Sequence, residues 1–228
     1  MQSYITIGTK SSTLPVSLTD LKAQLPVTGS TDDTRLTKLE WKAVDFIERQ
    51  LNRCLVTTSI TETYPRFPSY WDRPGMSQFV GSYGSPYLPF PLLNTPQGVP
   101  MYWQQMQRIT FHRSPVQSIT SVSYYDANNA LQTLTSGTDF YACLPTEKPA
   151  FIEPLTVFPI SYYRTDAVSL IYSAGYSTLP PALDEAICLL VGAWNENRED
   201  FLAMPTMFPS VPIGVQALIQ SCSTGDYY

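Results

Sequence analysis

The stretch Leu179–Asp200, LPPALDEAICLLVGAWNENRED, decides the fold because it is the clearest helix in the chain. Pro181 suits a first helical turn, where its missing N–H costs nothing, and Asp184 and Glu185 favour the positive end of the helix dipole. Pro205 prevents any continuation of the helix. The apolar residues recur at intervals of three and four positions and so form one stripe, which consists of Leu183, Ala186, Ile187, Leu190 and Trp194.

Two further helices are expected near the N-terminus, after residues 1–16, which read as extended. The first begins at Ser17, an N-cap residue with Asp20 three positions later, and runs to about Leu25. Thr31 or Asp32 caps a longer helix that reaches about Asn52. Its apolar face comprises Leu36, Leu39, Ala43, Ile47 and Leu51.

Short β-strands fill the region between these helices and Leu179. Residues 55–64 are rich in β-branched side chains, and Val56, Ile60 and Tyr64 share one face of the expected strand. A last short helix is expected at 214–220, with Val215 and either Leu218 or Ile219 as its anchors. The strands are expected at 55–64, 108–112, 117–125, 130–134, 140–143, 150–153 and 167–172.

The order of these elements predicts an α+β fold, because no βαβ alternation is present. Its helical core combines the N-terminal helix pair with the C-terminal helix, and a mainly antiparallel β unit is inserted between them. An extended C-terminal arm follows. The predicted units are 1–54, with the extended segment and helix pair; 55–176, the β-rich insertion; and 177–228, the C-terminal helix and arm.

Residues 65–107 form an excursion within the β unit that is rich in proline, glycine and aromatic residues and lacks any periodicity. Long loops of this kind are uncommon in compact domains and are usually functional. A flexible linker is one interpretation. The interpretation we favour is a segment that is ordered by itself or by a partner, because its aromatic side chains would pack on a surface.

The composition excludes several classes of function. With a net charge of −5 and no basic run, tight electrostatic binding to nucleic acid is not expected. No apolar run reaches the roughly 18 residues of a membrane span, and no signal peptide is recognised, so we expect a protein made in the cytoplasm without contact to a membrane. Charged residues make up 14% of the chain, against about 25% in typical soluble domains. A surface so poor in charge indicates that protein partners cover much of it.

The sequence contains no recognisable active-site motif, and a non-enzymatic protein without metal or cofactor is expected. His112 is the single histidine, and no nucleophile elbow accompanies it. Cys54, Cys143, Cys188 and Cys222 lie far apart and are expected to be reduced, mostly buried thiols. The polar run 195–200 reads either as a solvated helix end or as a patch at a subunit contact, in which Arg198 pairs with a neighbouring carboxylate.

Three segments, in this order, resemble the head–tail connector (adaptor) proteins of tailed bacteriophages. The first runs from Ser17-Leu18-Thr19-Asp20-Leu21-Lys22 to Arg53-Cys54-Leu55, and the second is Ser114–Asp126, similar to the central hairpin of the family. The third begins at Tyr172-Ser173-Ala174-Gly175-Tyr176 and ends in the helix with Glu196-Asn197-Arg198-Glu199. The resemblance covers roughly 1–64 and 108–222. The excursion is longer than the family pattern, and Asn195 stands where an aromatic residue is common.

This resemblance implies a structural protein of the virion at the head–tail interface. Such adaptors form rings, commonly of twelve copies, below the portal protein, extend the DNA channel without gripping the double-stranded DNA, and present a docking surface to a tail, nozzle or stopper protein. On this reading, Trp194, Glu196, Arg198 and Glu199 lie at subunit contacts. Contact with the tail or a neighbour is expected for Tyr70, Trp71, Phe79, Tyr83, Tyr87 and Phe90, and contact with the portal for Phe208, Val211, Ile213, Val215 and Leu218.

Two alternatives stay open at the level of sequence. A tail-completion or stopper protein of the same virion region would use the same small fold differently. A carbohydrate-binding or hydrolase module would stack sugars on the aromatic stretch 64–90, although the acidic residues near it are only Glu62 and Asp72.

Overall fold

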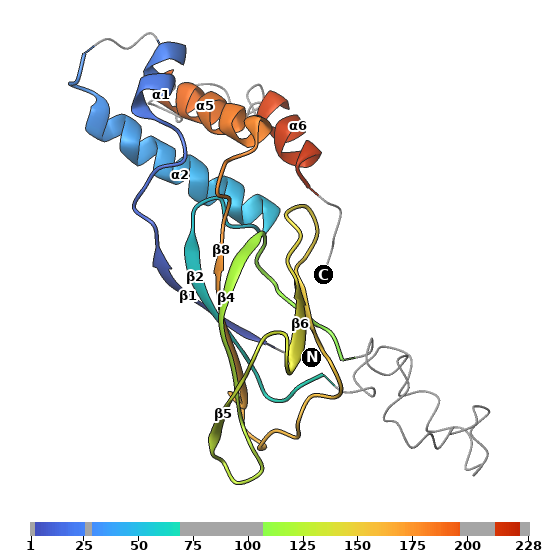
Figure 1. The fold of residues 1–228 in the computed structure, drawn as a ribbon. Coiled ribbons are helices and arrows are strands. Elements are labelled where there is room, and N and C mark those ends of the chain that lie inside the picture. Colours follow the sequence, from blue (N-terminus) through green and yellow to red (C-terminus); the bar gives the residue numbers. More distant parts are fainter. Residues whose placement is uncertain (1–2, 26–28, 69–106, 197–212, 224–228) are drawn as a thin grey trace, which may run out of the picture.

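A layer of helices and two antiparallel sheets make up the fold, in a computed structural model that describes residues 3–25, 29–68, 107–196 and 213–223. The helices pack together at one end, and the sheets extend away from them (Figure 1). This arrangement confirms the predicted α+β class, with helices near both ends of the chain and a mainly antiparallel β unit between them.

Four helices form the helical layer: α1 (Leu18–Gln24), α2 (Asp33–Leu51), α5 (Pro181–Glu196) and α6 (Ile213–Ser221). Ser17 caps α1 as predicted, and its hydroxyl oxygen accepts a hydrogen bond from the Asp20 amide at 3.1 Å. Asn52 ends α2 in the left-handed conformation, at a φ of 54°. The apolar stripe of α5 faces the other helices, and the core of the layer includes Leu21, Leu36, Ala43, Val44, Ile47, Leu183, Ala186, Ile187, Leu190, Val191, Val215 and Ile219.

The larger sheet has five strands in the order β1-β2-β8-β4-β5, each antiparallel to its neighbours. These strands are β1 (Tyr4–Lys10), β2 (Thr58–Tyr64), β8 (Val168–Ala174), β4 (Val116–Tyr125) and β5 (Leu131–Leu134). The residues expected only to be extended before the first helix therefore include an edge strand. β1 was missed because its pairing partner, β2, lies about fifty residues away, and periodicity within a segment does not report such pairing.

The smaller sheet has three strands in the order β3-β7-β6: β3 (Ile109–Thr110), β7 (Phe151–Pro154) and β6 (Phe140–Cys143). A second core fills the space between the two sheets. Its fully buried members include Ile60, Phe111, Ile152, Leu170 and Tyr172, and the Phe111 and Tyr172 rings meet edge-on at a centroid distance of 4.6 Å. The sheets thus form a sandwich with a core separate from that of the helices.

Glu48 and Gly175 shape the junction between the helical layer and the larger sheet. The Glu48 carboxylate in α2 accepts hydrogen bonds from the Leu55 amide at 2.8 Å and from Lys10 Nζ at 2.6 Å, so it ties the end of β1 to the segment before β2. Gly175 follows β8 with a φ of +137°, and a Cβ at this position would lie 2.7 Å from the backbone of Val56. Only glycine fits where the chain turns from β8 towards α5.

Candidate functional site

The end of α5, predicted to lie at a subunit contact, is partly committed to the subunit's own core. The Trp194 ring is half-buried and packs edge-on against Phe46 of α2, at a centroid distance of 6.2 Å. Asn195 is buried and accepts a hydrogen bond from Arg35. Glu196 is exposed. Of the two predicted contact residues that the structure describes, Trp194 and Glu196, the exposed Glu196 is therefore the one whose side chain could meet a neighbouring subunit. The other two, Arg198 and Glu199, lie outside the described residues.

Helix α6 contains three of the residues predicted to meet the portal, and they differ in exposure. Ile213 is 76% exposed, Leu218 is half-buried, and Val215 is fully buried in the helical core. Val215 cannot meet a partner while α6 stays packed, so Ile213 and Leu218 are the surface candidates on this helix. Phe208 and Val211 lie outside the described residues.

The aromatic residues predicted to contact the tail, Tyr70, Trp71, Phe79, Tyr83, Tyr87 and Phe90, also lie outside the described residues. The two points where the chain enters and leaves that region are described, and both contact Phe158. The Phe67 ring stacks on the Phe158 ring at a centroid distance of 4.4 Å, and the Phe158 amide donates a hydrogen bond to Gln107 Oε1 at 2.9 Å. Phe158 therefore anchors the base of the excursion.

Phe158 belongs to a loop, residues 155–163, that exposes large apolar side chains at the end of the sheets away from the helices (Figure 1). Ile160 is 85% exposed and Tyr163 is 98% exposed. The loop is held in place, because the Tyr162 amide donates to the carbonyl oxygen of Tyr125 at 2.8 Å and the Leu155 amide to that of Asp139 at 3.0 Å. We call this loop, whose exposed members are Leu155, Val157, Ile160, Tyr162 and Tyr163, the distal apolar loop.

An ion pair borders the distal apolar loop. The Arg164 guanidinium contacts the Asp166 carboxylate at 2.5 and 2.7 Å and stacks over the Tyr125 ring at 3.9 Å. The hydrogen bond from Arg164 holds the pKa of Asp166 below its usual value. Apolar side chains on a fixed backbone with a charged border are a typical protein-contact surface.

A buried polar cluster around Glu62 lies on the inner face of β2. The carboxylate is fully buried and accepts hydrogen bonds from the Tyr64 hydroxyl at 2.8 Å, from the His112 amide at 3.1 Å and from the Tyr172 hydroxyl, while His112 Nδ1 lies 3.2 Å away. Burial alone raises the pKa of Glu62, but the hydrogen bonds with His112, Tyr172 and Tyr64 outweigh it and hold that pKa below its usual value. Groups from three segments converge on this carboxylate, so the cluster acts as a cross-brace between β2, β8 and the segment after β3.

Sequence reasoning missed two buried carboxylates, and in both cases a signal was present. Glu62 lies between Ile60 and Tyr64 at the spacing of two that defines the inner face of a strand. Glu40 lies four residues after Leu36 and three before Ala43, on the buried face of α2. An acidic residue at an apolar position of a pattern indicates a buried hydrogen-bonded group.

Among the described residues, no group of three or more His, Cys, Asp or Glu side chains is placed to hold a metal ion. None of the helices described is both long and apolar enough to cross a membrane.

Comparison with solved structures identifies the fold. A chain from the virion of a native gene transfer agent particle superposes with a TM-score of 0.62 at 19% identity, over 98% of this chain and 97% of that one. The protein described here has the same fold as that chain. A chain from the neck of an empty particle of this kind, computed with C6 symmetry, gives 0.61 at 17% identity, over 100% and 98%. One from the neck of a native particle, computed with C12 symmetry, gives 0.59 at 17% identity, over 98% and 97%.

No protein-family model matches the chain, and no curated protein sequence matches it. The likeness to these solved structures spans nearly the full length of both chains, at sequence identities below 20%.

Proposed function

We propose that this protein is a structural component of the neck of a phage-like particle, and specifically the head–tail adaptor that forms a ring below the portal. The observation that carries the proposal is the fold, which is shared over at least 97% of their length with chains from gene transfer agent particles, two of them described as neck structures. The proposed role is assembly, without an enzymatic reaction.

The layout of the subunit supports a protein that connects two different partners. Helix α6, with Ile213 exposed, lies at the helical end, and the distal apolar loop lies at the opposite end of the sheets (Figure 1). We assign the helical end, together with Phe208, Val211 and Leu218, to the portal. The distal apolar loop and the excursion anchored on Phe158 are assigned to the next tail component.

A ring of twelve copies is the proposed assembly. The two neck structures were computed with C6 and C12 symmetry, and a ring of twelve is compatible with both. Head-to-tail contacts that close a ring cover two different patches of every subunit. The low proportion of charged residues, 14%, suits a surface that is covered in this way, and the net charge of −5 suits a channel through which DNA passes without being held.

Mass photometry of the purified full-length protein, alone and mixed with the portal, tests this function. The adaptor role predicts that a saturated portal gains the mass of a complete ring. With the Ile213→Asp variant the portal should gain no mass. With Glu185→Gln, a change at an exposed position of α5, it should gain the same mass as with the wild-type protein. Absence of any association between the wild-type protein and the portal would refute the adaptor role and favour a tail-completion or stopper protein of the same region.

A further inference from the structure

Strand β1 occupies one end of the five-stranded sheet, and no described strand lies beyond it. Both of its faces are open: Ile5 and Ile7 share one face and Tyr4 is on the other, with Ile7 59% exposed and Tyr4 52%. The strand contains no proline, and its first charged residue is Lys10 at its end. Soluble proteins usually protect an edge strand with charge, proline or a covering element, so an apolar, uncharged edge is suited to pairing with another chain.

Strand β4 has a second open edge. β8 pairs with β4 from Val116 to Tyr124, whereas β5 pairs with it only from Val122 to Tyr125. Residues 116–121 therefore have a partner strand on one side only in the described part of the chain, and Ser118 and Thr120 are exposed. This open stretch is close in length to the seven residues of β1.

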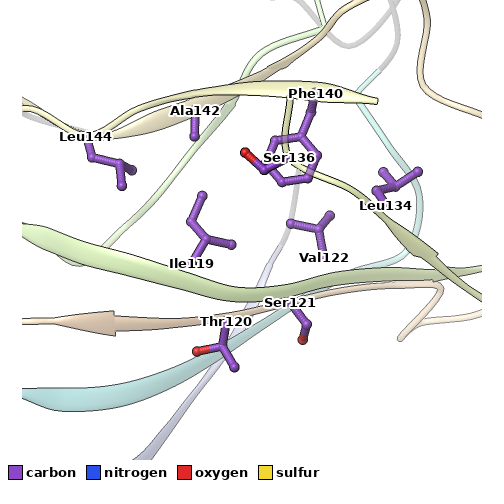
Figure 2. Close-up of a pocket in the computed structure, with 9 residues that line it drawn as sticks. All are labelled: Ile119, Thr120, Ser121, Val122, Leu134, Ser136, Phe140, Ala142 and Leu144. Carbon is purple, nitrogen blue, oxygen red and sulfur yellow. The ribbon is translucent and has the colours of Figure 1, made fainter. Parts of the chain in front are cut away.

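A hollow of about 200 Å³ adjoins the open edge of β4. In Figure 2, Ile119 and Val122 of β4 point into it from below, and Phe140, Ala142 and Leu144 close it from above. The side chains of Thr120 and Ser121 point away from the hollow, so these two residues line it with their backbone. Apolar walls beside an unpaired strand edge fit an extended segment with aliphatic side chains.

The directions of β1 and β4 are compatible with pairing between two copies of the chain. Each strand of the sheet is antiparallel to the next, so β1 runs in the same direction as β8 and opposite to β4. A second copy rotated about an axis along the strands would bring its β1 beside residues 116–121 of β4 in antiparallel orientation. This position lies between the helical end and β5, which already pairs with the rest of β4. Antiparallel pairing is the more stable kind.

From these features we infer that β1 of one subunit adds to the open edge of β4 in the next, with Ile5 and Ile7 entering the hollow between β4 and β6. The inference rests on the proposed ring, because a closed ring joins two different surfaces of the same chain. The five-stranded sheet then continues from subunit to subunit around the ring, and the exposed edge of β1 is covered by the assembly.

Disulfide trapping on the portal-bound ring tests the pairing directly. The half-buried Cys143 and Cys222 are replaced by serine, while Cys54 and Cys188 remain, because burial raises the pKa of these two thiols to about 11 and about 12 and keeps them unreactive. Cysteine is then introduced at Thr6 in β1 together with Ser118 or Thr120 in β4, all of them exposed. One of the two pairs should yield a ladder of covalent oligomers that extends to the full ring on a non-reducing gel.

Two controls give the result its meaning. Mixing subunits that contain only Thr6→Cys with subunits that contain only the β4 cysteine should stop the ladder at dimers. A variant with Thr6→Cys in β1 and Thr19→Cys on the exposed surface of α1 should give no ladder, because the proposed pairing does not bring these two positions together.

A second variant keeps the inference falsifiable without cysteine chemistry. Ile7→Asp should abolish ring formation with an unchanged urea midpoint, while Leu131→Asp, on the equally exposed β5, should leave the ring intact. Complete rings that show neither a ladder nor sensitivity to Ile7→Asp would overturn the pairing and leave the proposed function standing. Failure of the wild-type protein to form any ring would overturn both.

Discussion

The Glu40 carboxylate accepts a hydrogen bond from the Val16 amide at 3.1 Å, which ties the middle of α2 to the segment that leads into α1. Glu40 is fully buried, and its second oxygen has no hydrogen-bond partner among the described residues. Burial raises the pKa of Glu40 to about 7, the Val16 amide opposes this increase, and the nearby charge of Asp184 adds to it. The helical layer thus contains a carboxyl group that ionises only around neutral pH, above the usual range of a glutamate.

The first prediction concerns the pH dependence that Glu40 creates. The pKa of Glu40 is about 7 in the folded protein and about 4.5 in the unfolded chain. Between these two pH values the folded state therefore keeps a proton that the unfolded state has lost. The contribution of Glu40 to the free energy of unfolding should fall by about 3 kcal/mol as pH rises from 4.5 to 7. Urea titrations at pH 5, 6 and 7.5 should show this decline, and Glu40→Gln should flatten it. An unchanged slope in Glu40→Gln, matching that of the exposed control Glu185→Gln, would contradict the assignment.

The second prediction concerns the cluster around Glu62, whose pKa shift has the opposite sign. Because the folded pKa of Glu62 lies below its unfolded value, its stabilising contribution is complete above the unfolded pKa and is lost as pH falls through the folded one. Tyr172→Phe removes one buried donor to this carboxylate and should cost about 2 kcal/mol in urea unfolding at pH 7. Tyr141→Phe, at an exposed tyrosine, is the matched control. Equal stability of the two variants would show that the cluster is not a brace.

The third prediction concerns the turn after β8. Gly175→Ala places a Cβ 2.7 Å from the Val56 backbone at a φ of +137°, so strain and collision should together cost about 3 kcal/mol. Gly137→Ala, at a φ of +81° with nothing within 4 Å, tests the backbone conformation alone and should cost about 1 kcal/mol. Thermal unfolding of both variants measures the difference. A smaller loss in Gly175→Ala than in Gly137→Ala would refute the close approach.

The fourth prediction separates contact from folding on α6. Val215 is fully buried, so Val215→Asp should lower the free energy of unfolding by on the order of 3 kcal/mol or more. Ile213 is exposed, and Ile213→Asp should change stability by no more than about 0.5 kcal/mol while abolishing association with the portal. Unfolding curves and portal binding measured on both variants decide the matter. Normal portal binding by Ile213→Asp would exclude this helix end from the contact.

The fifth prediction concerns the distal apolar loop. Ile160→Ser combined with Tyr163→Ser removes two highly exposed apolar side chains, so stability and ring formation should be unaffected. Attachment of the next tail component should fail, and electron microscopy of particles assembled with this variant should show portals with rings but without tails. Particles with normal tails would move the tail contact elsewhere on the subunit.

Local patterns predicted those elements whose burial depends on neighbours in the sequence. The stripe from Leu183 to Leu190 is buried as expected, Ser17 caps α1, and β6 has the predicted bounds. The strand bounds elsewhere differ by a few residues, as with β2, which begins at Thr58 instead of Leu55. The candidate contact residues were harder to predict, because sequence periodicity separates buried from exposed positions only where the element packs on one face. Val215 and Ile213 show this, since they lie two residues apart in α6 with opposite exposure.

The sequence by itself determined the α+β class, the positions of the helices and the absence of a recognisable active-site motif, because helical stripes, caps and strand propensities act over a few residues. Only the tertiary structure decided which strands are neighbours, that β1 and residues 116–121 of β4 leave open edges, and that Glu40 and Glu62 are buried. Strand pairing joins residues as far apart as Glu62 and Leu170, and the environment of a carboxylate depends on donors from several segments. The physical reason is that hydrogen bonding between strands and desolvation are properties of the assembled chain, which no local window of sequence contains.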